Sequence, residues 1–373
     1  MFDMKLRLIL FLFLICSFHS STKAEKLVLK ECSFLGRVDN TCKGKVLFSF
    51  PGVSVKLKFK GSSMISVLMA DTLRSIPDQS NYFYLFIDGN LMGKIQPTTF
   101  FQPIVLADGL SKSEHTVELV KLTESQVGTT IFKGFLLDDK SKVLKSNYSA
   151  NLNFEFIGNS ITCGYGNEVA SFPPKSGFES VNQNNYFAWG AIVARKLSAN
   201  YQCVAYSGRG LRRNFSGDSL GTLPLIYNRV LPDDAASQWN LKNYIPNLLV
   251  INLGTNDFSA ETNLGLTVDS VDFVSSYLKF VKQLRDYYPK ATIVCVVGPM
   301  MSDDYPKGGM QWSRIQRYVN SVVSNRNIAG DSNIYYFVHE PQVPPFGEDY
   351  HPSKSTHKRM ADRFILFLKT IGY

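Results

Sequence analysis

The chain has 373 residues, a hydrophobic fraction of 45% and a charged fraction of 19%. These values exclude a disordered or fibrous protein and predict a globular chain of about two domains with a full hydrophobic core. The formal net charge of +9 comes from basic residues that are scattered along the sequence, without a basic cluster. We therefore expect a solvated basic surface and no nucleic-acid partner.

Residues 1–24 have the pattern of a secretory signal peptide. Lys5 and Arg7 precede an apolar run at 8–16, and the small residue Ala24 stands at the cleavage position. The apolar run is far shorter than the roughly 20 residues that a membrane span needs. The sequence therefore predicts a secreted, extracellular protein that has no membrane partner once the signal peptide is removed.

Five cysteines follow the predicted signal peptide, and an odd number leaves at least one thiol without an intramolecular partner. Cys32 and Cys42 are close in sequence and are expected to pair. Cys163 and Cys203 would meet if their strands are neighbours, and Cys295 in its apolar run is expected to be a buried thiol. Two glycosylation sequons agree with secretion, and they begin at Asn147 and Asn214.

Residues 25–146 are predicted to form an all-β domain. Apolar and polar residues alternate with a period of two over 53–59, which is typical of a strand that buries one face. The apolar run at 82–87 leads into Asp88-Gly89-Asn90, which is a hairpin signal. Many short strands with turn residues between them, and no helical period, indicate a β-sandwich.

After residue 147 predicted strands alternate with predicted helices. The strands are expected at 154–157, 201–205, 248–253, 292–297 and 334–338, and the helices at 186–197, 268–287, 310–325 and 355–371. This alternation predicts a parallel sheet that helices cover on both sides. In such folds the active site lies beyond the carboxyl ends of the strands.

Four polar motifs follow the ends of predicted strands or precede the last helix. They are Gly158-Asn159-Ser160, Ser207-Gly208-Arg209-Gly210, Gly254-Thr255-Asn256-Asp257 and Asp349-Tyr350-His351-Pro352. Each motif alone is compatible with a turn, a helix cap or a surface loop. Together they supply a serine nucleophile, an imidazole base and donors for an oxyanion, which is the set that acyl transfer needs.

The four motifs resemble those of the SGNH hydrolase superfamily. The resemblance is closest to carbohydrate esterase family 2, in which an N-terminal jelly-roll β-sandwich precedes an α/β SGNH hydrolase domain with three layers, and it extends over nearly the whole mature chain. It implies a sandwich domain at 25–146 and a hydrolase domain at 147–373. It also implies the deacetylation of polysaccharides such as xylan or mannan without a metal or another cofactor.

The resemblance also assigns roles to residues of this chain. Ser160 is expected to be the nucleophile and His351 the general base and then acid. The oxyanion hole is expected to consist of the N–H groups of Ser160 and Gly208 and the side chain of Asn256. Asp349 would orient His351, although some family members are thought to use a backbone carbonyl instead, and the sequence leaves this choice open.

Three features depart from the superfamily pattern. In the superfamily an aspartate commonly stands three residues before the histidine, whereas here Glu348 holds that position and Asp349 stands two before the histidine, as is usual in the closer family. Asn159 replaces the aspartate of the Gly-Asp-Ser motif, and because that aspartate does not accept the proton, the change is compatible with activity. Tyr350 stands where a tryptophan is expected beside the histidine. An aromatic side chain at this place can stack on a sugar ring, so the tyrosine bears on substrate preference.

The sequence therefore predicts a secreted, monomeric serine esterase that removes O-acetyl groups from a polysaccharide through an acyl-enzyme. Two alternatives remain at this point. One is an SGNH lipase or lysophospholipase, which would need an apolar lid that the loops beside Ser160 and His351 lack. The other is a carbohydrate-binding protein with a vestigial esterase site. The sandwich is expected to bind glycan, to form a wall of the site or only to stabilise the hydrolase domain.

Overall fold

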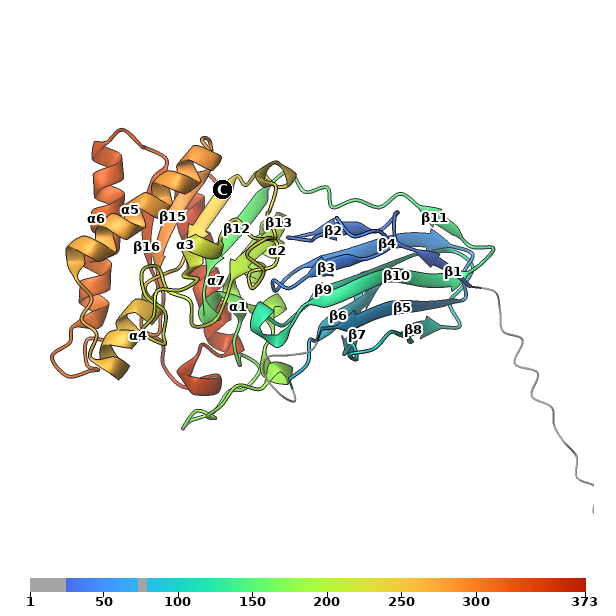
Figure 1. Cartoon of the computed structure of the whole chain (residues 1–373), viewed down its shortest axis with the longest axis horizontal. Helices are drawn as coiled ribbons and strands as arrows, with labels where there is room; N and C mark the ends of the chain where they lie inside the picture. Colours follow the sequence, from blue (N-terminus) through green and yellow to red (C-terminus); the bar gives the residue numbers. More distant parts are fainter. Residues whose placement is uncertain (1–24, 73–78) are drawn as a thin grey trace, which may run out of the picture.

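The computed structural model describes residues 25–72 and 79–373, so the predicted signal peptide lies outside the described part of the chain. Two antiparallel sheets come first along the chain, and a parallel sheet with helices follows them. The two halves lie side by side along the long axis of the molecule (Figure 1). This arrangement confirms the predicted fold class.

The first half is a sandwich of two antiparallel sheets. One sheet has the strand order β1 (Glu25–Val28), β10 (Thr130–Asp138), β5 (Met64–Asp71) and β8 (Gln102–Asp108), with β3 (Val46–Phe48) beside β10. The other has the order β11 (Lys142–Leu144), β4 (Ser54–Lys60), β9 (Glu114–Lys121), β6 (Phe83–Ile87) and β7 (Asn90–Ile95), with β2 (Ser33–Leu35) beside β4. The alternation that predicted β4 holds, because Val55, Leu57 and Phe59 are buried in the sandwich core.

The second half contains a sheet of five parallel strands. Their order is β13 (Asn200–Ala205), β12 (Asn153–Gly158), β14 (Leu248–Ile251), β15 (Thr292–Val297) and β16 (Ile334–Val338). Antiparallel pairing ends with β11 and parallel pairing begins with β12. The division of the chain into domains at residue 147 stays a prediction, and this change of sheet type is the feature that agrees with it.

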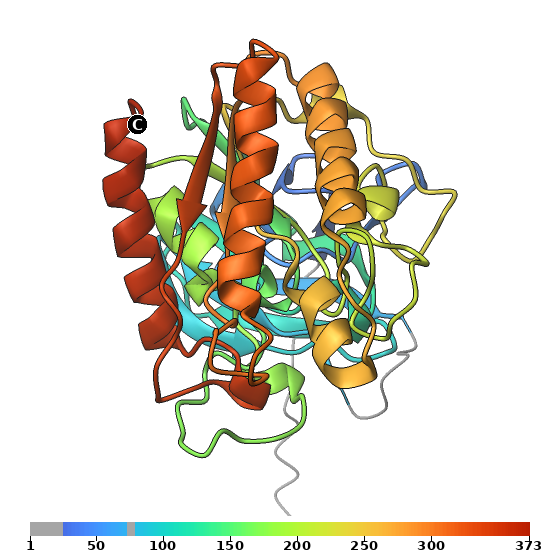
Figure 2. The ribbon, with the colours of Figure 1, turned by 90° about the vertical axis from the view of Figure 1, so that its left-hand side faces the viewer.

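Helices cover both faces of the parallel sheet. On one face lie α5 (Ser270–Tyr287) and α6 (Gln311–Ile328), and on the other α2 (Trp189–Lys196) and α7 (Lys354–Thr370). Figure 2 shows α5 beside α6, with β16 between α6 and α7. Successive residues of β14 point to opposite faces. Leu249 therefore packs in the core beneath α5 and α6, and Val250 packs in the core beneath α2 and α7.

The remaining helices of the described residues have ten residues or fewer. They are α1 (Ser160–Cys163), α3 (Leu223–Ile226), α4 (Thr255–Leu264), η1 (Ser125–Val127), η2 (Ser180–Asn182), η3 (Asn185–Phe187), η4 (Leu241–Asn243) and η5 (Glu348–Tyr350). The predicted helix at 186–197 begins later than expected, because Ala188 is extended and separates η3 from α2. Helix α4 was missed, since its sequence has almost no amphipathic period.

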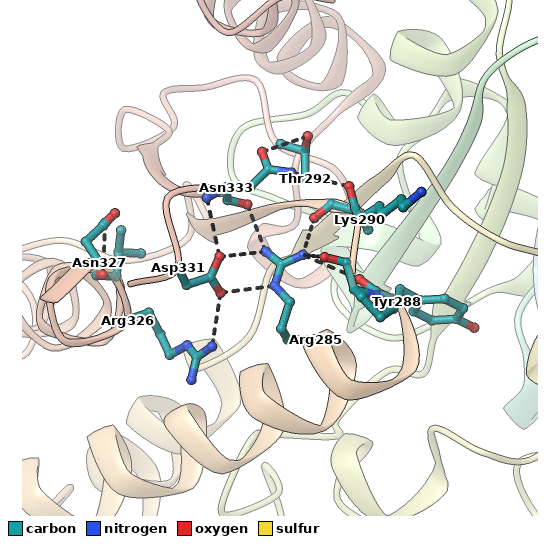
Figure 3. Close-up of polar contacts among 11 residues, drawn as sticks. Arg285, Tyr288, Lys290, Thr292, Arg326, Asn327, Asp331 and Asn333 are labelled. Atoms are coloured by element: carbon teal, nitrogen blue, oxygen red, sulfur yellow. Dashed lines mark hydrogen bonds and ion pairs between the residues drawn. The ribbon is translucent and has the colours of Figure 1, made fainter. Parts of the chain in front are cut away.

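The amino ends of β15 and β16 are tied together by Arg285 at the end of α5 (Figure 3). Its guanidinium donates to both carboxylate oxygens of Asp331, each at 3.0 Å, and to the carbonyl of Asn333 at 3.0 Å. Arg326 adds a bond of 3.1 Å to the same carboxylate. This cluster lies at the amino ends of the strands, whereas the polar motifs lie at the carboxyl ends.

The expected disulfides are not formed. All five cysteines of the described residues are free thiols. Cys32 points to the carbonyl of Val28 at 3.6 Å, and Cys42 is exposed. The Cys163 thiol points to a carboxylate of Glu124 at 3.7 Å, while Cys203 accepts from the amide of an asparagine at 3.7 Å. Cys163 and Cys203 thus have separate polar partners, and Cys295 is a buried thiol in β15, as expected.

The two sequons differ in accessibility. Asn147 is exposed, whereas Asn214 is buried and its amide donates to Asp218 and to the carbonyl of Leu220, both at 2.8 Å. Glycosylation stays a prediction, and only Asn147 offers its amide to an enzyme in the folded chain. Among the helices of the described residues, none has the length and apolar character that crossing a bilayer requires.

Candidate active site

Ser160 is the first residue of α1, directly after the carboxyl end of β12. Asn159 forms the N-cap of this helix and accepts a hydrogen bond from the N–H of Ile161 at 3.2 Å. Gly158 is needed for the close approach of helix and strand, because a Cβ there would lie 2.0 Å from the hydroxyl oxygen of Thr162. The turn therefore holds the Ser160 hydroxyl at the edge of the sheet, where only 8% of the residue is exposed.

The side chain of His351, which lies near the carboxyl terminus of the chain, contacts this hydroxyl. Its Nε2 lies 2.8 Å from Ser160 Oγ, although 191 residues separate the two in sequence. The loop between β16 and α7 carries the histidine across the carboxyl edge of the sheet to β12. The distance between Nε2 and Oγ is short enough for the imidazole to accept the hydroxyl proton, as a general base does for a nucleophile.

The other nitrogen of His351 faces a backbone carbonyl. Nδ1 lies 3.0 Å from the carbonyl oxygen of Glu348. This contact depends on a tight reversal of the chain, in which Asp349 has φ 48° and Tyr350 has φ 61°. Both are in the left-handed region, which non-glycine residues seldom adopt and which is frequent at functional sites.

The Asp349 carboxylate has different partners. It accepts a hydrogen bond from the hydroxyl of Tyr165 at 2.7 Å and from the N–H of Gly177 at 2.9 Å. The ring of Tyr165 in turn stacks on the His351 ring, with centroids 4.1 Å apart. Asp349 is thus linked to His351 only indirectly, by Tyr165 and by the backbone. Among the described residues, the imidazole donates no hydrogen bond to the Asp349 carboxylate.

Burial lowers the pKa of His351 to about 4, although the Glu348 carbonyl and the charge of Asp349 act in the opposite direction. The imidazole is therefore neutral at neutral pH. If Nδ1 donates to the Glu348 carbonyl, the lone pair of Nε2 points at the Ser160 hydroxyl. This is the protonation state that a general base requires.

The three expected oxyanion donors come from neighbouring strands. Gly208 follows β13 and has φ 75°, Ser160 follows β12, and Asn256 begins α4 after β14. The N–H groups of Ser160 and Gly208 donate to no other group among the described residues. The Asn256 amide donates one hydrogen to the carbonyl of Arg209 at 2.8 Å, which leaves its second hydrogen for a ligand.

Asp257, which the sequence reasoning did not assign, organises the loop that carries Gly208. Its buried carboxylate accepts hydrogen bonds from three successive N–H groups, those of Leu211 at 2.9 Å, Arg212 at 2.8 Å and Arg213 at 2.8 Å. Burial raises the pKa of Asp257 to about 6, while these bonds act to lower it. An acidic residue directly after Asn256, the asparagine expected in the oxyanion hole, was the available signal in the sequence.

Glu348 and Tyr165 were also missed. The Glu348 side chain is fully buried and accepts from the N–H of Glu179 at 3.1 Å and from the amide of Asn182 at 2.6 Å. These bonds hold the residue whose carbonyl faces His351. No group of three or more His, Cys, Asp or Glu side chains within the described ranges could hold a metal ion.

Both halves of the chain match known families. Residues 34–146 match the family described as carbohydrate esterase 2 N-terminal, and residues 156–359 match the GDSL-like lipase/acylhydrolase family. The chain belongs to carbohydrate esterase family 2. It is therefore a member of a family of ester hydrolases, which confirms the resemblance that the four motifs carry.

This family 2 chain is similar in sequence to two named esterases. It is 34% identical to the cellulase/esterase CelE of Acetivibrio thermocellus over 90% of its own length, and it spans only 39% of the length of that relative. It is 31% identical to an acetylxylan esterase / glucomannan deacetylase of Cellvibrio japonicus, over 86% of this chain and 85% of the relative.

The fold of this family 2 chain also matches a solved structure. A family two carbohydrate esterase from Clostridium thermocellum, determined in complex with cellohexaose, has a TM-score of 0.82 and 32% identity. The match covers 91% of this chain and 98% of that one. The shared architecture therefore includes both the sandwich and the hydrolase sheet.

Proposed function

We propose that the chain removes O-acetyl groups from a polysaccharide of the xylan or mannan type through an acyl-enzyme intermediate. The observation that carries the proposal is the chain of contacts from Ser160 Oγ to His351 Nε2 at 2.8 Å and from His351 Nδ1 to the Glu348 carbonyl at 3.0 Å. A hydroxyl has little nucleophilicity unless a base accepts its proton. This arrangement supplies that base in its neutral form.

The first half of the reaction acylates the serine. Ser160 Oγ attacks the acetyl carbonyl carbon while His351 Nε2 accepts the hydroxyl proton. The N–H groups of Ser160 and Gly208 and the amide of Asn256 stabilise the negative oxygen of the tetrahedral intermediate. When the intermediate collapses, His351 protonates the sugar oxygen, and the deacetylated sugar hydroxyl leaves.

The second half restores the enzyme. His351 accepts a proton from water, which attacks the acetyl carbonyl carbon of the acyl-enzyme. The same three donors stabilise the second tetrahedral intermediate. Collapse returns the proton from His351 to Ser160 Oγ and releases acetic acid, which then ionises to acetate in water, so that atoms and charge balance over the cycle.

We propose that the Glu348 carbonyl, and not the Asp349 carboxylate, orients His351. The carbonyl lies on Nδ1, while the carboxylate is engaged by Tyr165 and Gly177. A carbonyl dipole fixes the tautomer of the imidazole as a carboxylate would. Asp349 then acts by holding the turn and, through Tyr165, the ring plane of the histidine.

The carbohydrate substrate is supported by aromatic side chains beside the site and by the named relatives. Tyr350 directly precedes His351 and is 58% exposed. Its ring lies 5.5 Å from that of Phe346, which lies 6.2 Å from Phe172, a residue that is 72% exposed. Tyr350 and Phe172 are thus exposed rings with the half-buried Phe346 between them, and a row of accessible rings is suited to stacking on sugars. The deacetylase activities named for the Cellvibrio relative supply the choice of acetylated xylan and glucomannan as test substrates.

Secretion is part of the same proposal. A polysaccharide substrate lies outside the cell, and the predicted signal peptide at 1–24 would deliver the enzyme there. Expression of the full chain with a reporter at the carboxyl terminus should give a protein in the medium whose first residue is near position 25. Retention of the tagged chain inside the cell would contradict this part.

Acetate release decides the proposed activity. Wild type should release acetate from acetylated xylan or glucomannan, and Ser160→Ala should lose this activity. Ser216→Ala is the control, because Ser216 is exposed and contacts only Asp218. No release by wild type, or full release by Ser160→Ala, would contradict the esterase.

The two alternative functions are distinguished by further assays. Preference for long-chain lipid esters over acetyl esters would indicate a lipase. Retention on a polysaccharide column without labelling of Ser160 by a serine-directed phosphonate would indicate a protein that only binds carbohydrate.

A further inference from the structure

Glu124 belongs to the sandwich but reaches the active edge of the hydrolase sheet. It lies in the loop between β9 and β10, where η1 follows it, and Figure 1 shows this loop beside α1. The residue is fully buried. A glutamate in a connecting loop is ordinarily solvated, so its burial requires partners that stabilise the charge.

Both oxygens of the Glu124 carboxylate are bonded to one residue of the hydrolase half. Oε2 accepts from the N–H of Ser207 at 2.7 Å, and Oε1 accepts from the hydroxyl of the same serine at 2.5 Å. A bidentate contact of this kind fixes both the backbone and the side chain of Ser207. The next N–H along the chain is that of Gly208, the proposed oxyanion donor.

Further donors complete the environment of the carboxylate. The amide of Gln183 donates to Oε1 at 2.9 Å and accepts from the Glu124 N–H at 3.1 Å, so the two residues are paired in both directions. The thiol of Cys163, the last residue of α1, lies 3.7 Å from Oε2. Glu124 therefore contacts the helix that begins with Ser160 as well as the residue before Gly208.

We propose that Glu124 is a positioning residue for the oxyanion hole: its carboxylate holds Ser207 so that the Gly208 N–H points at the site of the developing oxyanion. The sandwich would then supply part of the catalytic framework and not only a surface or a stabilising contact. The inference rests on the proposed esterase function, because it concerns the same oxyanion hole.

The convergent donors require an acceptor-only carboxylate at Glu124. Burial raises the pKa of Glu124, while the hydrogen bonds from Ser207 and Gln183 lower it. Lys121, the last residue of β9, is also fully buried, and its Nζ donates to the Thr123 carbonyl at 2.7 Å. Burial lowers the pKa of Lys121 to about 7, against the charges of Asp71 and Glu124. A buried basic residue thus directly precedes the loop that carries Glu124.

The test is Glu124→Gln, compared with Glu155→Gln on β12. Glu155 is also fully buried and also joins the two halves, since it lies 3.5 Å from Arg37 of the sandwich. Its place in the strand keeps it away from the oxyanion donors. The two variants therefore make the same chemical change in equally buried positions, and only the first touches the loop of Gly208.

Glu124→Gln should lower kcat on a soluble aryl acetate by about tenfold to a hundredfold and change KM by less than about threefold, since misplacing one oxyanion donor acts on the transition state. The rate at which a phosphonate labels Ser160 should fall in parallel, because the phosphonyl oxygen occupies the same hole. Glu155→Gln should keep kcat within about threefold of wild type, whatever its thermal stability.

Ser207→Ala supplies a second and independent variant. It removes the hydroxyl donor of Ser207 and keeps its N–H donor to the Glu124 carboxylate. The variant should lower kcat by about threefold to tenfold. If Glu124 acts through Ser207, the effects of the two substitutions on kcat should not add in the double variant. Should Glu124→Gln fail to give a cooperative melting transition, the Ser207→Ala result decides alone.

The outcomes separate the inference from the proposed function. A kcat for Glu124→Gln or Ser207→Ala equal to that of Glu155→Gln would overturn the role of Glu124 while leaving the esterase intact. Fully additive effects in the double variant would also overturn it, because Glu124 would then act by another route. Absence of all acetyl-ester hydrolysis by wild type would remove the proposed function, and the inference with it.

Discussion

The two ends of the parallel sheet are built in opposite ways. At the amino end, Arg285 and Asp331 satisfy one another and the neighbouring carbonyls, and their side chains are 13% and 8% exposed (Figure 3). At the carboxyl end, Asp349 and Tyr350 have left-handed backbones, and the N–H groups of Ser160 and Gly208 have no acceptor among the described residues. The polar groups at the amino end are thus satisfied within the fold, whereas two N–H groups at the carboxyl end remain available to a ligand.

Among the variants that test this comparison, Asn256→Ala is expected to have the largest effect on kcat. Loss of a preorganised oxyanion donor should lower kcat by about 10² to 10³, with a small change in the melting temperature. Steady-state kinetics on an aryl acetate and a thermal melt measure the two quantities. Asn263→Ala, an exposed position in the same helix, is the control and should leave both unchanged. A loss below about fivefold would mean that Asn256 does not face the oxyanion.

Arg285→Met tests the opposite end of the sheet. It leaves the Asp331 carboxylate and several carbonyls without their buried partner, so the free energy of unfolding should fall by about 3 kcal/mol. The kcat should stay at the wild-type value. On the same helix, Lys282→Met removes an exposed pair with Asp286 and should cost less than about 0.5 kcal/mol. Equal losses in urea unfolding of the two variants would contradict the role of the cluster.

The pH dependence of kcat/KM should reflect His351. Because burial lowers its pKa to about 4 from an ordinary value of 6.5, the base stays neutral down to that pH, and activity should be lost only below it. Stability also falls as the pH falls, but in a higher pH range. Between pH 6.5 and 4 the unfolded chain binds a proton that the folded imidazole does not, so the free energy of unfolding should fall as the pH falls.

A pH series measures both quantities when kcat/KM and a thermal melt are recorded at each pH. His115→Gln is the control, because His115 pairs with Asp88 in the sandwich and should leave the acid limb of kcat/KM in place. An acid limb centred near pH 6.5 would show that the folded imidazole titrates as it does in a solvated peptide.

The smallest effect is expected from Asp349→Asn. Asparagine adopts the left-handed backbone readily and can still accept one hydrogen bond, so kcat should fall by less than about tenfold. If the carboxylate itself oriented the imidazole, the loss should be on the order of 10⁴. Tyr165→Phe, which keeps the stacked ring and removes only the hydroxyl, should reproduce most of the Asp349→Asn effect on kcat.

Local patterns in the sequence identified the elements that carry the site. Period-two alternation predicted β4, and apolar runs predicted β12 and β15, because burial on one or both faces of a sheet leaves a direct trace in residue order. The motifs at Ser160, Gly208, Asn256 and His351 could be placed at one edge, since the carboxyl ends of parallel strands meet there. Weakly periodic α4 left no such trace and was missed.

The sequence by itself therefore determined the class of the fold, the order of its two halves and the residue types of the candidate site. The tertiary structure alone decided which group lies on His351 Nδ1 and which loop contacts Ser207. A backbone carbonyl such as that of Glu348 has no signature in the sequence, and a buried Glu124 looks like any loop glutamate until its partners surround it. Both contacts join segments whose separation depends on how the sheets pack, and residue order does not record that packing.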